Sequence, residues 1–275
     1  MTSESRTGGS ADEGRVMGAR NPRIVELRRL VGRRSSGSPE VILEGPRTVA
    51  ESLDAGFVPD LVVIPDDRAD QVAVVEVLDR IPSDVEVLVL RGSAFNKLAP
   101  TVTPQPMLAV VPRPVAGIPS SLADDDLVMV LVDVSDPGNV GTLIRVADAV
   151  AARCVVVIGG ADPWGAKAVR SSTGSVMRVP VASGMDADAA LSALRDAGAR
   201  IVATDVSKGT PHDSGVLATP AAIVLGSEAH GLSHDLDSLV DVWVNINMPG
   251  RVESLNVAMA GTLLAFEARR PGGIG

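Results

Sequence analysis

The sequence predicts an α/β fold divided into two regions, and three observations support this prediction. Short apolar runs alternate with segments of helical periodicity along most of the 275 residues. Hydrophobic residues make up 45% of the chain, which is enough for a sizeable core. A stretch rich in proline, glycine and serine, residues 112–121, interrupts the alternation. A chain of this length forms one large domain or two modest ones, and the interruption favours two.

The first region, residues 21–113, reads as a small α/β domain. Residues 1–20 before it are polar and have no periodicity, so we expect a disordered tail. A helix is expected from Asn21, because Pro22 suits a first turn and apolar residues follow at helical spacing. The later elements are strands 41–43, 61–64, 85–90 and 107–111, a helix carrying Val49 and Leu53, and a helix over 69–78.

The second region, residues 126–270, follows a linker over residues 114–125 and restarts the alternation. Alternating strands and helices favour a mostly parallel sheet with helices on both faces. The expected strands are 127–134, 154–158, 201–205, 221–225 and 242–246, and the expected helices are 139–152, 186–196 and 254–269.

Charge and composition narrow the classes of function. The net charge of −9 argues mildly against a protein that coats nucleic acid non-specifically. Between Arg15 and Arg34, however, seven arginines face a single acid, Glu26. This segment is either a solvated basic tail or an arm that contacts phosphates.

The chain carries no sign of export, membrane insertion or metal binding. No uncharged run approaches the roughly 18 apolar residues of a membrane span, and the amino terminus lacks an apolar signal, so we expect a cytoplasmic protein. The single cysteine, Cys154, excludes an internal disulfide and is expected to be buried. Three histidines and one cysteine lack zinc-type spacing, and we expect no metal.

Three loops that follow apolar strands carry glycine and polar side chains. In the first, residues 135–141, Asp136 can cap a helix on which Arg145 lies one turn past Gly141. Free amide groups at such a helix start attract an anion, although an ordinary capped helix with a surface arginine explains the pattern as well. The loop lacks the Gly-x-Gly-x-x-Gly and phosphate-loop patterns, which disfavours a nicotinamide or ATP enzyme.

The other two loops each place a polar group beside apolar segments. Residues 225–233 hold a carboxylate, Glu228, between two glycines, and such a charge needs a partner, for which Arg145 is the natural candidate. In residues 246–257, Gly250 allows a tight turn and Ser254 can cap a helix, so that Asn256 is a buried amide that braces a loop or touches a ligand. Since ligands bind at the carboxyl ends of parallel strands, we expect one composite site.

Together these loops resemble the SpoU (TrmH) family of RNA ribose methyltransferases, within the SPOUT class. The matching elements are Asp-x-x-Asn-x-Gly-x-x-x-Arg at 136–145, Leu-Gly-Ser-Glu-x-x-Gly-Leu-Ser at 225–233, and Ile-x-Met followed by Ser-Leu-Asn-Val within 246–257. Asn247 departs from the pattern, because the family usually has proline there, and this leaves the course of residues 247–249 open. Residues 21–113 look like the ribosomal-protein-like substrate-binding domain of many members. The chain is similar to ribosomal RNA methyltransferases, including those that confer antibiotic resistance.

The resemblance implies a deep trefoil knot in the carboxyl-terminal SPOUT domain and S-adenosyl-L-methionine as cofactor. The reaction would methylate a ribose 2′-hydroxyl, most often in ribosomal RNA. The implied cofactor-binding residues are Thr204, Leu225, Gly226, Ile246, Met248 and Leu255. The implied catalytic residues are Arg145, Asn139, Glu228, Ser254 and Asn256. The family mechanism gives Arg145 the task of activating the hydroxyl; because arginine stays protonated, we favour an electrostatic clamp on phosphate.

RNA would be recognised through its shape and phosphates, because the chain has no Tyr, three Phe and two Trp for stacking. The candidate RNA-binding residues are Arg23, Arg28, Arg29, Arg47 and Arg170. The segment 170–174 suits a phosphate contact, but a plain surface turn explains it nearly as well. The resemblance also implies a homodimer formed through the knotted domain.

Three alternatives remain at this stage. The first is a catalytically silent RNA-binding or ribosome-assembly factor on the same fold, which the intact Asn139, Arg145, Glu228 and Asn256 set disfavours. The second is an enzyme that methylates a tRNA ribose or a base nitrogen. The third, a Rossmann oxidoreductase, lacks its glycine fingerprint. The sequence does not distinguish housekeeping modification from antibiotic resistance.

Overall fold

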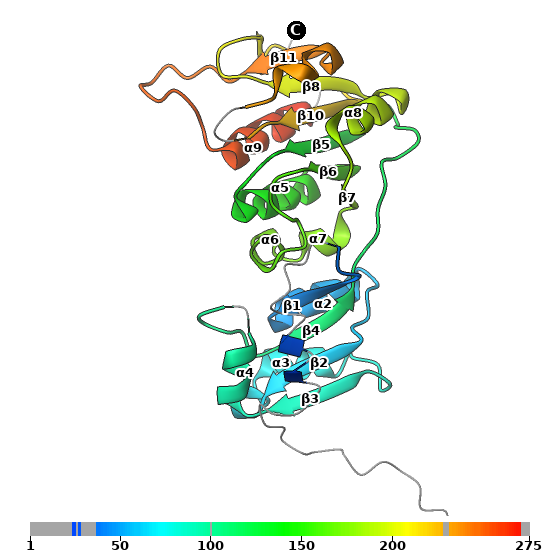
Figure 1. Ribbon diagram of the computed structural model, residues 1–275, viewed down its shortest axis with the longest axis vertical. Helices are drawn as coiled ribbons and strands as arrows, with labels where there is room; N and C mark the ends of the chain where they lie inside the picture. The colour runs from blue at the N-terminus through cyan, green and yellow to red at the C-terminus, as the bar shows by residue number, and fades with distance from the viewer. Residues whose placement is uncertain (1–23, 26, 29–36, 100, 228–230, 271–275) are drawn as a thin grey trace, which may run out of the picture.

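The computed structural model describes residues 24–25, 27–28, 37–99, 101–227 and 231–270, and it contains two sheets stacked along the long axis of the molecule (Figure 1). The four-stranded sheet belongs to the first region of the sequence and the seven-stranded sheet to the second. The α/β prediction is confirmed. The domain boundaries given above stay predictions, and so does the trefoil knot. The expected tail over 1–20 lies outside the described residues.

The smaller sheet is mixed, with strand order β1-β4-β2-β3. Strand β4 runs antiparallel to both its neighbours, whereas β2 and β3 are parallel. Its strands are β1 (Glu40–Glu44), β2 (Leu61–Pro65), β3 (Glu86–Leu90) and β4 (Leu108–Pro112), and its helices are α2 (Pro46–Asp54), α3 (Val72–Leu78), α4 (Gly92–Leu98) and the 3-10 turn η1 (Asp66–Arg68). The sequence did not predict α4, because seven residues are too few for a helical period to stand out.

A helix precedes this sheet, as expected. Residues 24–25 and 27–28 are helical, and Ile24 and Leu27 are buried in a cluster with Leu88 and Phe95. Val31, the third residue of the expected apolar face, lies outside the described residues. The amphipathic pattern of this segment therefore packs on the smaller sheet.

The larger sheet is parallel in every pairing, with strand order β7-β6-β5-β10-β8-β11-β9. Strands β5, β6 and β10 are buried along their whole length, which explains why they read as continuous apolar runs. The strands are β5 (Leu127–Val132), β6 (Cys154–Ile158), β7 (Val181–Ser183), β8 (Arg200–Thr204), β9 (Thr210–Pro211), β10 (Ala221–Leu225) and β11 (Val242–Asn245). The unpredicted β7 and β9 are short strands at the two edges.

Helices cover both faces of this sheet, as the alternation predicted. In Figure 1, α5 and α9 lie on one face and α8 on the other. Leu143 and Leu264 pack in one cluster with Leu131, while Leu191 packs in a separate cluster with Val130. The helices are α5 (Pro137–Ala149), α6 (Ala166–Ser172), α7 (Ser175–Arg178), α8 (Ala187–Asp196) and α9 (Val257–Ala268), with a 3-10 turn η2 (His234–Leu239). Helices α6 and α7 lie toward the smaller domain and were not predicted.

Helices α5 and α9 run side by side in the same direction. Asn256 contacts Asn139 at their amino ends, and Arg269 donates to the carbonyl oxygen of Val150 at 2.8 Å at their carboxyl ends. Between these contacts, Gly261 allows close packing, because a Cβ there would lie 2.4 Å from the side chain of Leu143. The two helices form one layer whose outer side faces away from the sheet.

Cys154 begins strand β6 and is fully buried, as predicted. Burial raises the pKa of its thiol to about 11, which keeps the thiol protonated at neutral pH. In the part of the chain that the structure describes, no helix is long and apolar enough to cross a bilayer.

Candidate active site

A pocket of about 450 Å³ opens at the carboxyl ends of β8, β10 and β11. Its walls come from the loops that follow these strands and from the start of α9. All six residues predicted to bind the cofactor lie in this wall: Thr204, Leu225, Gly226, Ile246, Met248 and Leu255. The structure therefore brings together residues that are up to 51 positions apart in the sequence, although their role as cofactor ligands stays a prediction.

The loop after β10 closes on itself and requires glycine at its first position. The backbone amide of Ser227 donates to Gly231 at 3.0 Å, and the amide of Gly231 donates back to Ser227 at 2.9 Å. A Cβ on Gly226 would lie 2.4 Å from the carbonyl carbon of Gly231. Glu228 and His230 lie outside the described residues, so the suggested pairing of Glu228 with Arg145 stays a prediction.

The start of α9 corrects two expectations. The helix begins at Val257 and is capped by Asn256, whose Oδ1 accepts from the amides of Ala258 at 2.9 Å and Met259 at 3.4 Å. Ser254 was expected to be the cap and lines the pocket instead. The reason is that the side-chain Oδ1 of Asn256 reaches the free backbone amides of the first turn, and asparagine is among the best N-caps. Asn256 is exposed, so it is not the buried amide that the sequence suggested.

Asn256 also joins the pocket to α5. Its Nδ2 donates to Asn139 Oδ1 at 3.1 Å, which realises the bracing role that the sequence left open. The start of α5 is fixed in turn by Asp136, whose Oδ1 accepts from Lys167 Nζ at 2.8 Å and from the Gly138 amide at 2.5 Å. The hydrogen bond from Lys167, followed by that from Gly138, lowers the pKa of Asp136. Both ends of the Asn139–Asn256 contact therefore rest on capped helices.

Asp205 lines the pocket and was missed by the sequence analysis, which placed it inside a strand. Its carboxylate accepts from the amides of Ser207 at 2.8 Å and Lys208 at 3.1 Å. Burial raises the pKa of Asp205, but hydrogen bonds from Ser207 and Lys208 outweigh this effect and lower it overall. A second carboxylate, Glu253, also lines the pocket and was missed, although its place directly before Ser254 could have indicated it.

Arg145 lies on α5 but does not line the pocket. Six residues along a helix separate it from Asn139, a rise of about 9 Å, and turn it toward a different side of α5. Its side chain is exposed, and none of the residues that the structure describes forms a hydrogen bond or ion pair with it. Of the predicted catalytic residues, the structure thus brings Asn139, Ser254 and Asn256 to the pocket region and leaves Arg145 exposed on α5, while Glu228 lies outside the described residues.

The predicted RNA-binding arginines are spread over both domains. Arg28, Arg47 and Arg170 are exposed, whereas Arg23 and Arg29 lie outside the described residues. Arg47 pairs with Glu51 at 3.2 Å. Among the described residues, no group of three or more His, Cys, Asp or Glu side chains could hold a metal ion.

The pocket fits a ligand that combines a flat apolar part with positive charge. Its volume falls within the range of about 300–1,000 Å³ that is usual for small-molecule sites. Leu225, Ile246 and Leu255 offer apolar surface, and the carboxylates of Asp205 and Glu253 suit a cation. S-adenosylmethionine carries a purine, a sulfonium and an amino group, and so it matches these walls.

Comparison with known proteins supports the same assignment. The model of the SpoU rRNA Methylase family matches residues 126–266. The chain is 28% identical to the 23S rRNA (guanosine(2553)-2′-O)-methyltransferase RlmP of Bacillus subtilis, over 92% of this chain and 98% of that protein. It is 29% identical to the 23S rRNA (uridine(2479)-2′-O)-methyltransferase of Streptomyces viridochromogenes, over 92% of this chain and 91% of that protein.

Solved structures agree over both domains. The SpoU methyltransferase AviRb of Streptomyces viridochromogenes, in complex with AdoMet, superposes with a TM-score of 0.82 at 28% identity, covering 91% of this chain and 98% of AviRb. An AdoMet-bound rRNA methyltransferase of Sinorhizobium meliloti gives 0.80 at 26% identity, covering 93% and 97%. The sequence-based prediction of an RNA methyltransferase is confirmed, and the chain belongs to the SpoU rRNA methylase family.

Proposed function

We propose that this protein transfers a methyl group from S-adenosylmethionine to a ribose 2′-hydroxyl of 23S ribosomal RNA. The observation that carries the proposal is the convergence of six predicted cofactor residues on one pocket at the carboxyl edge of the sheet. The two full-length relatives named above both methylate 23S rRNA riboses according to their names, which supports the choice of substrate. With ribosomal RNA as substrate, the protein would act in the cytoplasm.

The pocket residues would hold the cofactor in two ways. Leu225, Ile246 and Leu255 would pack against the purine, while the unshielded backbone at Gly226 would supply main-chain hydrogen bonds. Asp205 and Glu253 would attract the positive charges. When bound, the cofactor supplies an electrophilic methyl group on a sulfonium whose charge disappears on transfer.

Arg145 would contact the RNA rather than the cofactor. A neutral ribose hydroxyl is a poor nucleophile, and a nearby guanidinium stabilises the negative charge that develops on its oxygen. The same planar group can bind the adjacent phosphate through two hydrogen bonds, which fixes the ribose. Asn139 and Asn256 would position α5, the helix on which Arg145 stands.

A homodimer through the outer side of α5 and α9 would complete the site. Met259, Leu263 and Phe266 follow one another on this side of α9 and are 62%, 46% and 55% exposed. Exposed apolar side chains at such spacing favour a protein interface. Arg145 is exposed on the neighbouring α5, and we propose that it stands beside the partner subunit. We expect Phe266→Glu to yield a monomer in sedimentation equilibrium, and a dimer of unchanged affinity would contradict this part of the proposal.

Methyl transfer from labelled cofactor to deproteinised 23S rRNA tests the reaction directly. Mass spectrometry of the digested RNA should detect a single 2′-O-methylated nucleoside, and reverse-transcription stops at low nucleotide concentration should map it. A methyl group on a base, or label in tRNA alone, would favour the enzyme of the second alternative. Failure to bind the cofactor in calorimetry would favour a silent RNA-binding factor.

A further inference from the structure

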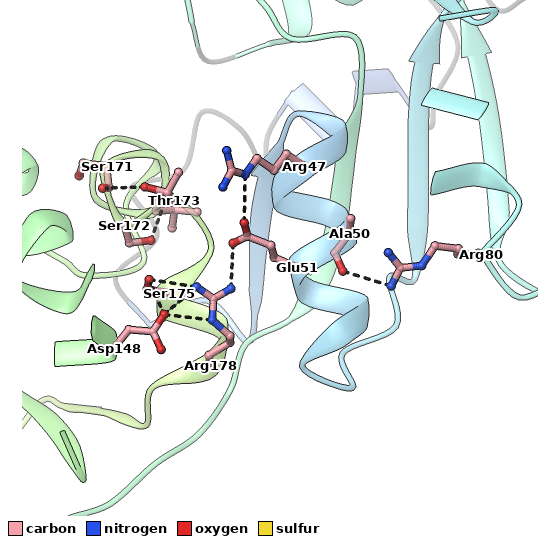
Figure 2. A network of polar contacts seen from close by, with 11 residues as sticks. Arg47, Ala50, Glu51, Arg80, Asp148, Ser171, Ser172, Thr173, Ser175 and Arg178 are labelled. Carbon is pink, nitrogen blue, oxygen red and sulfur yellow. Dashed lines mark hydrogen bonds and ion pairs between the residues drawn. The ribbon is translucent and has the colours of Figure 1, made fainter. Parts of the chain in front are cut away.

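One guanidinium joins the two domains, and the proposed chemistry does not use it (Figure 2). Arg178, at the end of α7, donates from Nη1 to Glu51 Oε2 of α2 at 2.9 Å. Its other side donates to Asp148 Oδ2 of α5, from Nη2 at 2.6 Å and from Nε at 3.0 Å. Ser175 Oγ donates to the same Asp148 oxygen at 2.8 Å. Arg178 therefore connects the smaller domain with the helix that carries Arg145.

The three charged groups are better shielded than a typical surface pair. The side chains of Glu51, Asp148 and Arg178 are 17%, 27% and 37% exposed. The hydrogen bonds to Asp148, and then those to Glu51, raise the pKa of Arg178. Partial burial reduces screening by salt, and the planar fork of arginine holds two carboxylates in fixed directions. The arrangement therefore fixes the relative orientation of the two carboxylates in addition to attracting both to the guanidinium.

The contact between α2 and the turn before α7, called the domain seam below, leaves space for the Glu51 side chain. Gly174 has φ +85, and a Cβ there would lie 1.7 Å from Glu51 Oε2, so a side chain would displace the carboxylate. Val49 of α2 and Val176 of α7 belong to one hydrophobic cluster that continues across the domain seam. The segment 170–174, which the sequence offered as a phosphate contact or a surface turn, thus meets the smaller domain at its last residue.

We infer that Arg178 is a positioning residue that holds the two domains at the angle at which one RNA contacts both. Two domains joined by a modest interface otherwise move relative to each other. Asp148 follows Arg145 by three residues on α5. The contacts of Arg178 with Asp148 and Glu51 therefore fix the position of the smaller domain, with its exposed Arg47, relative to the proposed catalytic guanidinium. The RNA part of this inference rests on the proposed function, whereas the domain geometry does not.

Small-angle X-ray scattering and methylation kinetics on the full chain test the inference. Arg178→Ala and Glu51→Gln should each enlarge the maximum dimension of the protein and raise the KM for rRNA about three- to tenfold. The kcat should change less than about twofold, and so should the cofactor Kd from calorimetry, because the pocket is not touched. Arg178→Lys keeps the charge but reaches one carboxylate, and should give intermediate values.

Two control variants remove ion pairs that lie within one domain. Arg80→Ala breaks the pair with Asp54 in the smaller domain, and Arg195→Ala breaks the pair with Asp241 in the larger one. Both should leave the scattering profile unchanged. Arg47→Ala should raise the KM for rRNA without enlarging the protein, which separates a lost RNA contact from a lost orientation.

The outcomes decide between the two proposals. Unchanged scattering for Arg178→Ala and Glu51→Gln would overturn the inference, and a raised KM with unchanged scattering would assign Arg178 a direct RNA contact instead. Should Arg178→Ala fail to fold, Glu51→Gln still tests the domain seam, because it leaves the Asp148 arm intact. A wild-type protein that methylates no RNA would contradict the proposed function, while scattering alone would still decide the domain geometry.

Discussion

The pocket and the outer side of the α5 and α9 layer belong to the same domain, yet the pocket is enclosed by loops of this chain whereas the outer side is open to solvent. Loops from three strands close around the pocket, and Gly226 fits its neighbours so tightly that no side chain is possible there. The outer side instead leaves Arg145 of α5 and the apolar residues Met259, Leu263 and Phe266 of α9 exposed. Under the proposed function, a single subunit would suffice to bind the cofactor, whereas methyl transfer would also need RNA and the proposed second copy of the chain.

The largest expected effect comes from a variant that changes the outer side of the α5 and α9 layer and leaves the pocket unchanged. Arg145→Ala should lower turnover about 100- to 1,000-fold, because it removes a preorganised charge from the transition state. The cofactor Kd should stay within about twofold of wild type, since Arg145 does not line the pocket. A labelled-methyl assay and calorimetry measure the two quantities.

Two variants serve as controls for this prediction. Arg145→Lys keeps the charge without the fork and should recover part of the activity. Arg153→Ala removes another exposed arginine of the same domain and should leave turnover unchanged. Substantial turnover by Arg145→Ala would exclude the proposed role.

The next largest effect is expected from a variant that changes the pocket and leaves the outer side unchanged. Gly226→Ala should raise the cofactor Kd at least about tenfold, because the added Cβ forces the loop away from Gly231 at a cost of about 1–3 kcal/mol. Gly250→Ala is a matched control in the next loop, where a Cβ would meet nothing within 4 Å. Equal cofactor affinity for both variants in calorimetry would contradict the geometry of the closed loop.

A smaller effect tests the contact that joins the two regions. Asn256→Ala removes the cap of α9 and the bond to Asn139, and should lower the free energy of unfolding by about 1–2 kcal/mol. Asn256→Asp keeps the capping acceptor but cannot donate, so it should retain most of the stability while lowering turnover about three- to tenfold. Chemical denaturation and the methylation assay separate the roles, and equal turnover for Asn256→Asp and wild type would show that the bond does not position α5.

The smallest expected effect depends on pH. Because folding lowers the pKa of Asp205, its charge stabilises the folded state above the unfolded pKa, and this contribution disappears as the pH falls through the folded pKa. Asp205→Asn should therefore lower the free energy of unfolding by less than about 1 kcal/mol at pH 7 and by a smaller amount near pH 3. Urea denaturation at both pH values checks the sign, and an equal loss at both would assign the effect to packing.

The sequence predicted the pocket well because parallel strands bring their carboxyl ends to one edge of a sheet. Once the strands ending near Thr204, Leu225 and Ile246 were identified, their loops had to meet. It failed where the signal is local and short: α6, α7 and the edge strands have too few residues for a period. The cap of α9 was misplaced because Ser254 and Asn256 are both good capping residues, and only the chain path decides between them.

The separation of Arg145 from the pocket was also beyond the sequence. Asn139 and Arg145 share one motif, and a linear pattern does not state that six helical residues turn two side chains apart. Likewise, the pairing of Glu51 with Arg178 spans 127 positions and two domains, and neither residue stands in a recognisable pattern.

The protonated, enclosed thiol of Cys154 has a practical consequence for experiments on this enzyme. Maleimide and spin-label reagents are attacked by a thiolate at the surface, and the native cysteine is neither ionised nor exposed. One engineered cysteine on each domain could therefore carry a fluorophore pair while Cys154 stays in place, and distances could then be followed in solution while RNA binds.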